Sequence, residues 1–93
     1  MFVIEDEAHA EPQGEFDSFE SALAELRRRA RIPWDAAPNV APCSGWRTCG
    51  RRYEVVEVDT AEAPGREIRR VHVVDIAASG VTWAEPFNSI EST

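Results

Sequence analysis

Two cysteines, Cys43 and Cys49, are the residues of this chain best suited to covalent or redox chemistry. Five residues separate them, and the same segment also holds Arg47, Arg51 and Arg52. Positive charge near a thiol lowers its pKa and favours the reactive thiolate. The pattern permits a thiol-based enzyme or redox sensor, a reversible Cys43–Cys49 disulfide, or plain reduced cysteines. We favour reduced cysteines, because free cysteine is commonly buried as a small apolar side chain.

Metal, cofactor and acid–base chemistry have little support in the residue pattern. A structural zinc ion needs four ligands, and the further nitrogen donors His9 and His72 are distant in sequence and lack a short His–His spacing. No glycine-rich phosphate-binding motif is present. His72 has no local signature that pairs it with a nucleophile, so we interpret it as a partly exposed strand residue. We therefore expect no metal ion, no cofactor and no catalytic residue.

Tryptophan and arginine are the residues that most often dominate binding interfaces, and both types are concentrated between residues 34 and 52. The main hypothesis is a non-catalytic binding or interaction module that uses this segment. Its partner is a protein or a second copy of the chain, with a homodimer formed by strand pairing or by a tryptophan-containing face. A small anion is a further candidate ligand for the arginines, and the alternative is that they pair with carboxylates of the same chain. The expected contact residues are Trp34, Trp46, Arg47, Arg51 and Arg52.

The charge of −7 is distributed in blocks along the 93 residues. Residues 1–26 carry eight acids and no base, residues 27–52 carry seven arginines and one acid, and residues 53–93 are again acidic. An acidic protein repels nucleic acid, so nucleic-acid binding is disfavoured. The simplest expectation is that the blocks neutralise one another within the fold. The acidic start also supports another alternative, an inhibitor or mimic that engages a basic partner surface.

One helix is indicated after residue 17. Phe19, Leu23, Leu26 and Ala30 recur at helical spacing and form one apolar face, which Ala22 widens. Asp17 is the expected N-cap, with Glu20 completing a capping box, and Pro33 is expected to end the helix. Glu25 is expected to pair with Arg29 one turn later.

The remaining segments predict strands and loops. Phe2–Ile4 has the character of a short buried strand, and residues 5–15 are interpreted as an acidic loop because of Pro12 and Gly14. Residues 32–50 form a long loop rich in proline and tryptophan, and residues 85–93 a tail. Strands are expected over residues 52–59, over 67 or 68 to 76 or 77, and over 81–83. The first two strands are expected to form a hairpin. Because its alternation is imperfect, the strand over residues 52–59 either has both faces partly covered or contains a bulge.

Together these elements predict an α+β fold in one domain spanning residues 1–93. The order β-α-long loop-β-β-β suggests one amphipathic helix packed on a mostly antiparallel sheet of three to four strands. The ten basic residues are all arginine, which suggests a bacterial origin. The sequence shows neither a secretion signal nor an apolar run of membrane-spanning length, so a cytoplasmic location without membrane association is expected.

Overall fold

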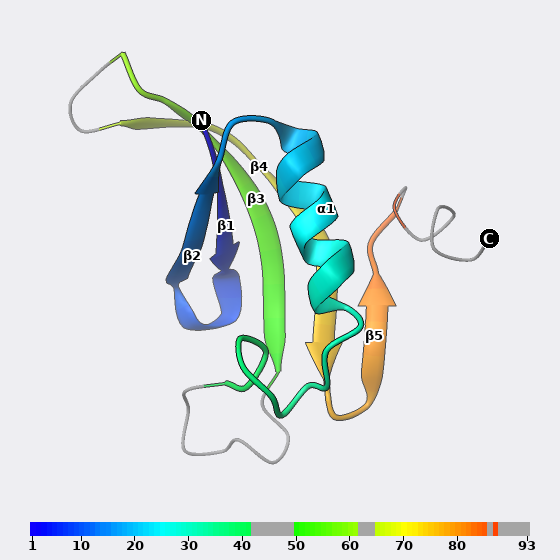
Figure 1. The fold of residues 1–93 in the computed structure, drawn as a ribbon. Coiled ribbons are helices and arrows are strands. Elements are labelled where there is room, and N and C mark those ends of the chain that lie inside the picture. Colours follow the sequence, from blue (N-terminus) through cyan, green and yellow to red (C-terminus); the bar gives the residue numbers. More distant parts are fainter. Residues whose placement is uncertain (42–49, 62–64, 86, 88–93) are drawn as a thin grey trace.

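The computed structural model describes residues 1–41, 50–61, 65–85 and 87. Within these residues the chain forms a five-stranded antiparallel sheet and one α-helix, which confirms the α+β class with more strands than expected (Figure 1). The elements in chain order are β1 (Phe2–Asp6), a 3-10 turn (Glu7–His9), β2 (Glu11–Phe16), α1 (Phe19–Arg29), β3 (Arg51–Asp59), β4 (Arg66–Ala77) and β5 (Gly80–Trp83).

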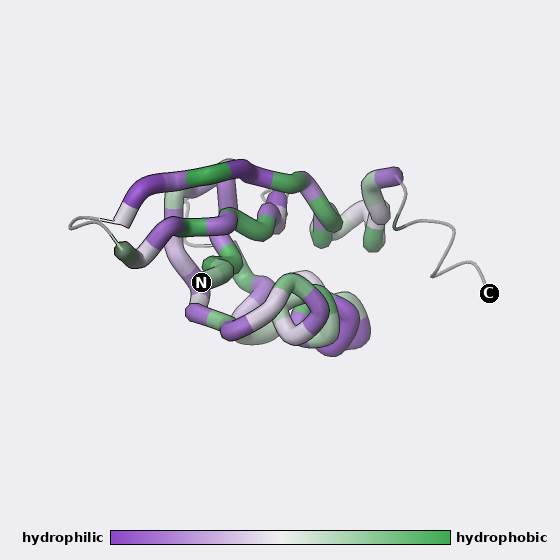
Figure 2. Tube along the Cα trace, turned by 90° about the horizontal axis from the view of Figure 1, so that it is seen from above, coloured by the Kyte–Doolittle hydropathy of each residue, from purple (hydrophilic) through white to green (hydrophobic). Residues whose placement is uncertain are grey.

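The strand order in the sheet is β2-β1-β3-β4-β5, so the N-terminal strand lies inside the sheet rather than at its margin. All neighbouring strands are antiparallel. Seen end-on, the twisted sheet curls over α1, which covers one face only (Figure 2). We refer to the two sides as the helix face and the open face. In the described part of the chain, no helix has the length and apolar character required to cross a bilayer.

The prediction of a loop over residues 5–15 is wrong. This segment extends β1 to Asp6, makes a 3-10 turn and returns as β2. The proline and glycine that argued against a strand are tolerated because β2 is an edge strand, where Pro12 need not donate to a second neighbour. Gly14 adopts a φ of 132°, a conformation that glycine reaches without steric cost, close to an irregularity in the β1–β2 register.

Helix α1 buries the expected face, but its N-terminal cap differs from the prediction. Leu23 and Leu26 are buried against the sheet. The N-cap is Ser18, not Asp17: the Ser18 hydroxyl accepts from the Ser21 amide at 3.1 Å, and the Ser21 hydroxyl completes the capping box. Serine suits both positions because its short hydroxyl reaches the unpaired amides of the first turn. The helix ends at Arg29, well before the proline that was expected to end it.

The core lies between α1 and the helix face of β1, β3 and β4. Ile4, Tyr53 and Val74 are fully buried there. The β3–β4 hairpin is confirmed, and it contains two register shifts, between Tyr53 and Glu54 and between Glu57 and Val58. The first shift places Val73 as an extra residue of β4, so consecutive residues 73 and 74 are both buried. The imperfect alternation of the strand expected over residues 52–59 has another cause: Val55 and Val56 of β3 are both buried, so both faces of that strand are covered.

The long loop after α1 is described up to residue 41, where it contains neither helix nor strand, and residues 42–49 lie outside the described residues. Asn39 fixes the described part: its side-chain amide donates to the carbonyls of Arg29 at 2.8 Å and Ile32 at 2.9 Å. Of the expected tail, Phe87 is buried and packs beside Phe19 with ring centroids 6.0 Å apart.

Candidate functional site

The structure describes three of the expected contact residues, and they lie in different surroundings. Arg51 is buried on the helix face, Arg52 lies on the open face, and Trp34 borders a pocket. Because Arg51 and Arg52 are consecutive in a strand, their side chains point to opposite faces and do not converge on one anion. Trp46, Arg47, Cys43 and Cys49 lie outside the described residues.

Arg51 belongs to a buried network at the end of the sheet where β1 stops and β3 starts. Its Nη1 donates to Asp6 Oδ2 at 2.9 Å and to Glu11 Oε1 at 2.8 Å, and its Nη2 donates to the Val40 carbonyl at 2.8 Å. Burial lowers the pKa of Arg51, but the hydrogen bonds to Asp6 and Glu11 outweigh this, so the net pKa is raised. Arg51 therefore ties β1, β2 and the long loop together from within.

The Asp6 carboxylate is the centre of this network and is fully buried. Its Oδ1 accepts from the amides of Ala8 and Arg52, both at 3.1 Å. Its Oδ2 lies 2.6 Å from His9 Nδ1 and receives the Arg51 guanidinium. The burial of this carboxylate is compensated by its hydrogen bonds, which fix the position of each donor.

A second part of the network joins the helix to the same end of the sheet. Arg29 lies over the Tyr53 ring, with its guanidinium carbon 5.3 Å from the ring centroid, and its Nη1 donates to Gln13 Oε1 at 2.9 Å. The Tyr53 hydroxyl donates to Asn39 Oδ1 at 3.1 Å. Burial is the main cause of a raised pKa at Tyr53. The expected Glu25–Arg29 pair is present at 2.7 Å.

The open face of the sheet carries the other main group of charges. Arg70 extends over it and contacts Glu5, Glu54 at 2.9 Å and Glu67 at 2.9 Å. These hydrogen bonds, that of Glu67 first, raise the pKa of Arg70. Arg52 approaches carboxylates of Glu7 and Asp75 on the same face. The arginine-rich block therefore pairs with both acidic blocks through Arg52, whereas Arg70 pairs with carboxylates of its own acidic block and of the acidic start.

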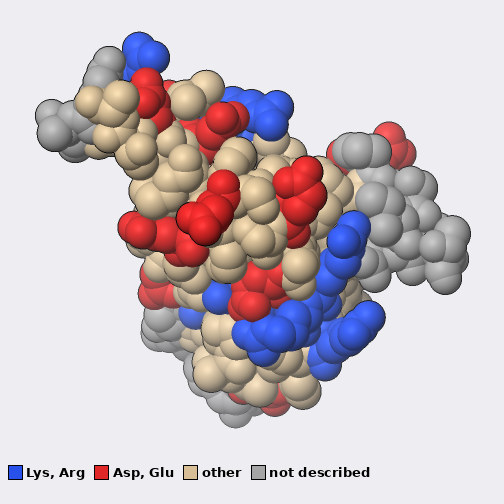
Figure 3. All heavy atoms as spheres, turned by 45° about the horizontal axis from the view of Figure 1, so that its top comes forward, with Lys and Arg blue, Asp and Glu red and all other residues tan. Residues whose placement is uncertain are grey.

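Figure 3 shows how the remaining charge is arranged on the helix side. Basic side chains gather over the C-terminal half of α1, whereas carboxylates spread over the upper part of the view (Figure 3). Arg28, the most exposed of the paired arginines on the helix, binds Glu25 through two hydrogen bonds. This pairing is the largest cause of a Glu25 pKa of about 2, below the ordinary value of 4.5.

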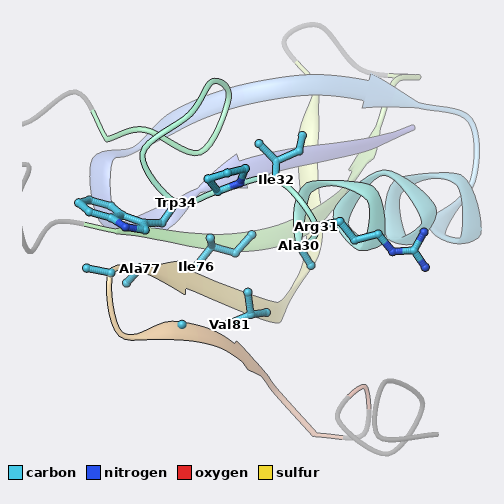
Figure 4. A pocket seen from close by; sticks show the side chains of 10 residues that line it. Ala30, Arg31, Ile32, Trp34, Ile76, Ala77 and Val81 are labelled. Carbon is cyan, nitrogen blue, oxygen red and sulfur yellow. The ribbon is translucent and has the colours of Figure 1, made fainter.

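An open pocket of ≈ 300 Å³ lies between the long loop and the β4–β5 hairpin. Ile32 and Trp34 form its loop side, and Ile76, Ala77 and Val81 form its sheet side (Figure 4). The lining is mostly apolar, and the Arg31 side chain extends away from the cavity (Figure 4). Such a pocket accommodates an apolar side chain.

The pocket opens beside β5, which ends the sheet. No strand of the described residues pairs with the outer edge of β5. The Ala84 amide donates to the Val73 carbonyl at 2.8 Å, which makes these two a hydrogen-bonded pair of the antiparallel ladder. Since such pairs alternate along a ladder, Thr82 also bonds to β4, whereas Val81 and Trp83 direct their N–H and C=O groups outward. Val81 is 41% exposed.

The opposite edge, β2, is built differently. It contains Pro12, which has no N–H to offer, the left-handed Gly14, and the carboxylates of Glu11 and Glu15. Proline, irregular backbone and charge are the devices that prevent an edge strand from pairing with another chain. The strand residues of β5, Gly-Val-Thr-Trp, contain none of these except the glycine at the turn.

Sequence reasoning missed several residues of this end of the molecule. Asp6, Asn39 and Tyr53 were not selected, although each is fully buried and joins separate segments. A polar residue between apolar neighbours, as Asn39 is between Pro38 and Val40, was the available signal. The edge position of β5 depends on strand order and had no signal in the residue types.

Within the described residues, no group of three or more histidine, cysteine or acidic side chains is arranged to hold a metal ion. Comparison with known proteins adds no functional information, since no protein-family model, curated protein or solved structure matches the chain.

Proposed function

We propose that this protein is a non-catalytic interaction module that binds an extended segment of a protein partner along β5. The partner segment continues the sheet as an additional strand. Its backbone pairs with the outward N–H and C=O groups of Val81 and Trp83, and one of its side chains enters the pocket beside Trp34.

The observation that carries this proposal is the difference between the two edges of one sheet. The edge at β2 is protected by proline, by a left-handed glycine and by charge, whereas β5 is an uncharged strand whose outward hydrogen-bonding groups pair with no strand of the described residues. An unprotected edge is a hazard for solubility, so it is expected where pairing serves a purpose.

The pocket supplies a second support for strand binding. In recognition by strand addition, backbone hydrogen bonds provide affinity and pockets for alternate side chains provide specificity. Val81 belongs to both the edge and the pocket lining, so a strand paired with β5 passes the pocket mouth directly. This arrangement gives Trp34, one of the expected contact residues, a role in selecting the partner's side chain.

The proposal changes the roles of the two described arginines of the segment. The Nη1 and Nη2 donors of Arg51 are directed to Asp6, Glu11 and Val40 inside the fold, so its role is to hold the loop that carries Trp34. Arg52 lies on the open face, where it pairs with Glu7 and Asp75. The hypotheses for Cys43, Trp46, Arg47 and Cys49 stay open, since these residues lie outside the described part of the chain.

The test compares Val81→Pro with Val81→Thr. Proline removes the outward N–H of residue 81 without removing a hydrogen bond to β4, whereas threonine keeps both the N–H and the β-branched shape. Peptides selected from a random-peptide phage library on wild-type protein are titrated into each variant by calorimetry. We expect Val81→Thr to bind like wild type. Val81→Pro should bind at least about tenfold more weakly, because it lacks the outward N–H; a tenfold loss of affinity corresponds to about 1.4 kcal/mol.

A second readout locates the bound peptide. Peptide binding should slow amide hydrogen exchange at Val81 and Trp83 while leaving Thr82 unchanged, because only the outward amides gain partners. Failure to select any peptide, or equal affinity of the selected peptides for wild type and Val81→Pro, would refute binding along β5.

A further inference from the structure

We propose that the partner at β5 is a second copy of this chain, and that the two β5 strands pair antiparallel about a two-fold axis through Thr82. This inference rests on the proposed function and adds the identity of the partner and the register. The result is one continuous sheet across two copies, in which both helices lie on the same face.

The hydrogen-bonding pattern of β5 selects this register. Residues that exchange hydrogen bonds across an antiparallel pair must both direct their backbone groups toward the partner strand. On β5 these are Val81 and Trp83. Centring the pair on Thr82 sets Val81 of each copy opposite Trp83 of the other, which uses all of these groups and gives about four hydrogen bonds between the copies.

The side chains are self-complementary in the same register. Val81 and Trp83 lie on the helix face, where they pair with Ile76 and Val74 of β4, so the contact between copies is an aromatic ring against a β-branched side chain. Thr82 lies on the open face opposite its own copy, and threonine pairs are favourable across antiparallel strands. Trp83 of the second copy thereby lies against Val81, at the rim of the pocket.

The charge distribution also favours a second copy at this edge. Two molecules of charge −7 repel each other over most of their surfaces. The strand residues of β5 carry no charge. In the proposed register Glu85 falls opposite Ser79 of the other copy and not opposite a carboxylate. This edge is therefore a place where two copies approach without direct like-charge contact.

The expected dimer is weak. A strand pair this short buries much less surface than the roughly 1,600 Å² of a standard stable interface, so we expect a monomer–dimer equilibrium in the micromolar range or weaker. Analytical ultracentrifugation over a concentration series up to about 1 mM covers this range.

The test is a charge exchange at Thr82. Like charges directly opposite each other in an antiparallel pair are destabilising, and opposite charges are stabilising. Thr82→Lys and Thr82→Asp are each expected to weaken self-association at least tenfold. An equimolar mixture of the two variants is expected to recover association to the wild-type level or above. Thr82 is exposed, so both variants should keep the fold, which circular dichroism checks.

The outcomes separate this inference from the proposed function. A wild-type chain that stays monomeric at every concentration, while selected peptides still bind and Val81→Pro abolishes their binding, refutes the second copy and leaves the edge-binding function intact. If the chain dimerises and the dissociation constant is unchanged by Val81→Pro and by both Thr82 variants, the interface lies elsewhere and the second-copy proposal at β5 is refuted.

The register can also be tested on the wild-type protein, without any variant that has to fold. In a mixture of isotope-labelled and unlabelled chains, the proposed register predicts nuclear Overhauser contacts between the Thr82 α-protons of the two copies, because these residues form the closely spaced, non-hydrogen-bonded pair. Dimerisation without these contacts refutes the register.

Discussion

The Asp6 carboxylate shows how one buried charge organises this small fold. It accepts hydrogen bonds from two backbone amides and one guanidinium and lies beside one imidazole, and these groups join β1, which carries Asp6, to the following turn and to β3. A lone buried carboxylate would be costly, but one with this many donors is compensated. Removing the Asp6 carboxylate would in turn leave a costly buried charge on Arg51, because Arg51 is itself 6% exposed and would keep its charge.

We therefore predict that Asp6→Asn lowers the free energy of unfolding by about 3 kcal/mol, since it leaves the Arg51 charge only partly compensated. Urea denaturation monitored by tryptophan fluorescence measures the change. Glu7→Gln is the control, because its side chain is exposed and lies 3.6 Å from Arg52, a contact that is worth little. Equal stabilities of the two variants would contradict a central role for Asp6.

At the scale of elements, the N-terminus of α1 provides a direct comparison between sequence and structure. Two adjacent residues, Asp17 and Ser18, are both good N-caps, and the residue types alone do not decide between them. The structure places Ser18 at the cap, with an extended backbone at φ −140° and ψ 159°. β2 ends at Phe16 and α1 begins at Phe19, so both candidate caps lie in the two-residue connection between them.

The cap assignment predicts that Ser18→Ala destabilises the protein by about 1 kcal/mol, because the Ser21 amide loses its acceptor. Asp17→Ala should change stability by no more than a few tenths of a kcal/mol. Thermal unfolding of both variants under the same conditions measures the difference. The reverse order of stabilities would show that Asp17 is the cap in solution.

The sequence predicted those elements whose pattern of apolar residues lies within the element itself. The helix was found from the spacing of Leu23 and Leu26, and the β3–β4 hairpin from its β-branched residues. β2 was missed because Pro12 and Gly14 are acceptable only on an edge, and the edge position depends on the whole strand order. The sequence allowed a bulge in the strand over residues 52–59, but the extra residue, Val73, lies on β4, and residue types do not place it because a register is a property of two strands.

At the scale of the whole molecule, the candidate site could be predicted only in part. Trp34 was selected from its residue type, and it does border the pocket. Arg51 was selected for the same reason, but its position opposite Asp6 and Glu11 directs it inward, and this depends on contacts between residues about 40 or more positions apart. The open edge at β5 arises from the sheet order, which short-range patterns do not encode.

The whole-molecule charge gives a prediction that separates two modes of association. Binding of an acidic chain to a basic partner surface weakens as salt screens the attraction. Pairing of two copies of charge −7 through an uncharged strand should instead strengthen, because salt screens their mutual repulsion and leaves the strand contacts unaffected. Sedimentation equilibrium at about 0.02 M and about 0.3 M salt, ionic strengths with Debye lengths of roughly 20 and 6 Å, should give a dissociation constant that falls several-fold. A dissociation constant that rises with salt would show that attraction between opposite charges, and not pairing at β5, holds the two copies together.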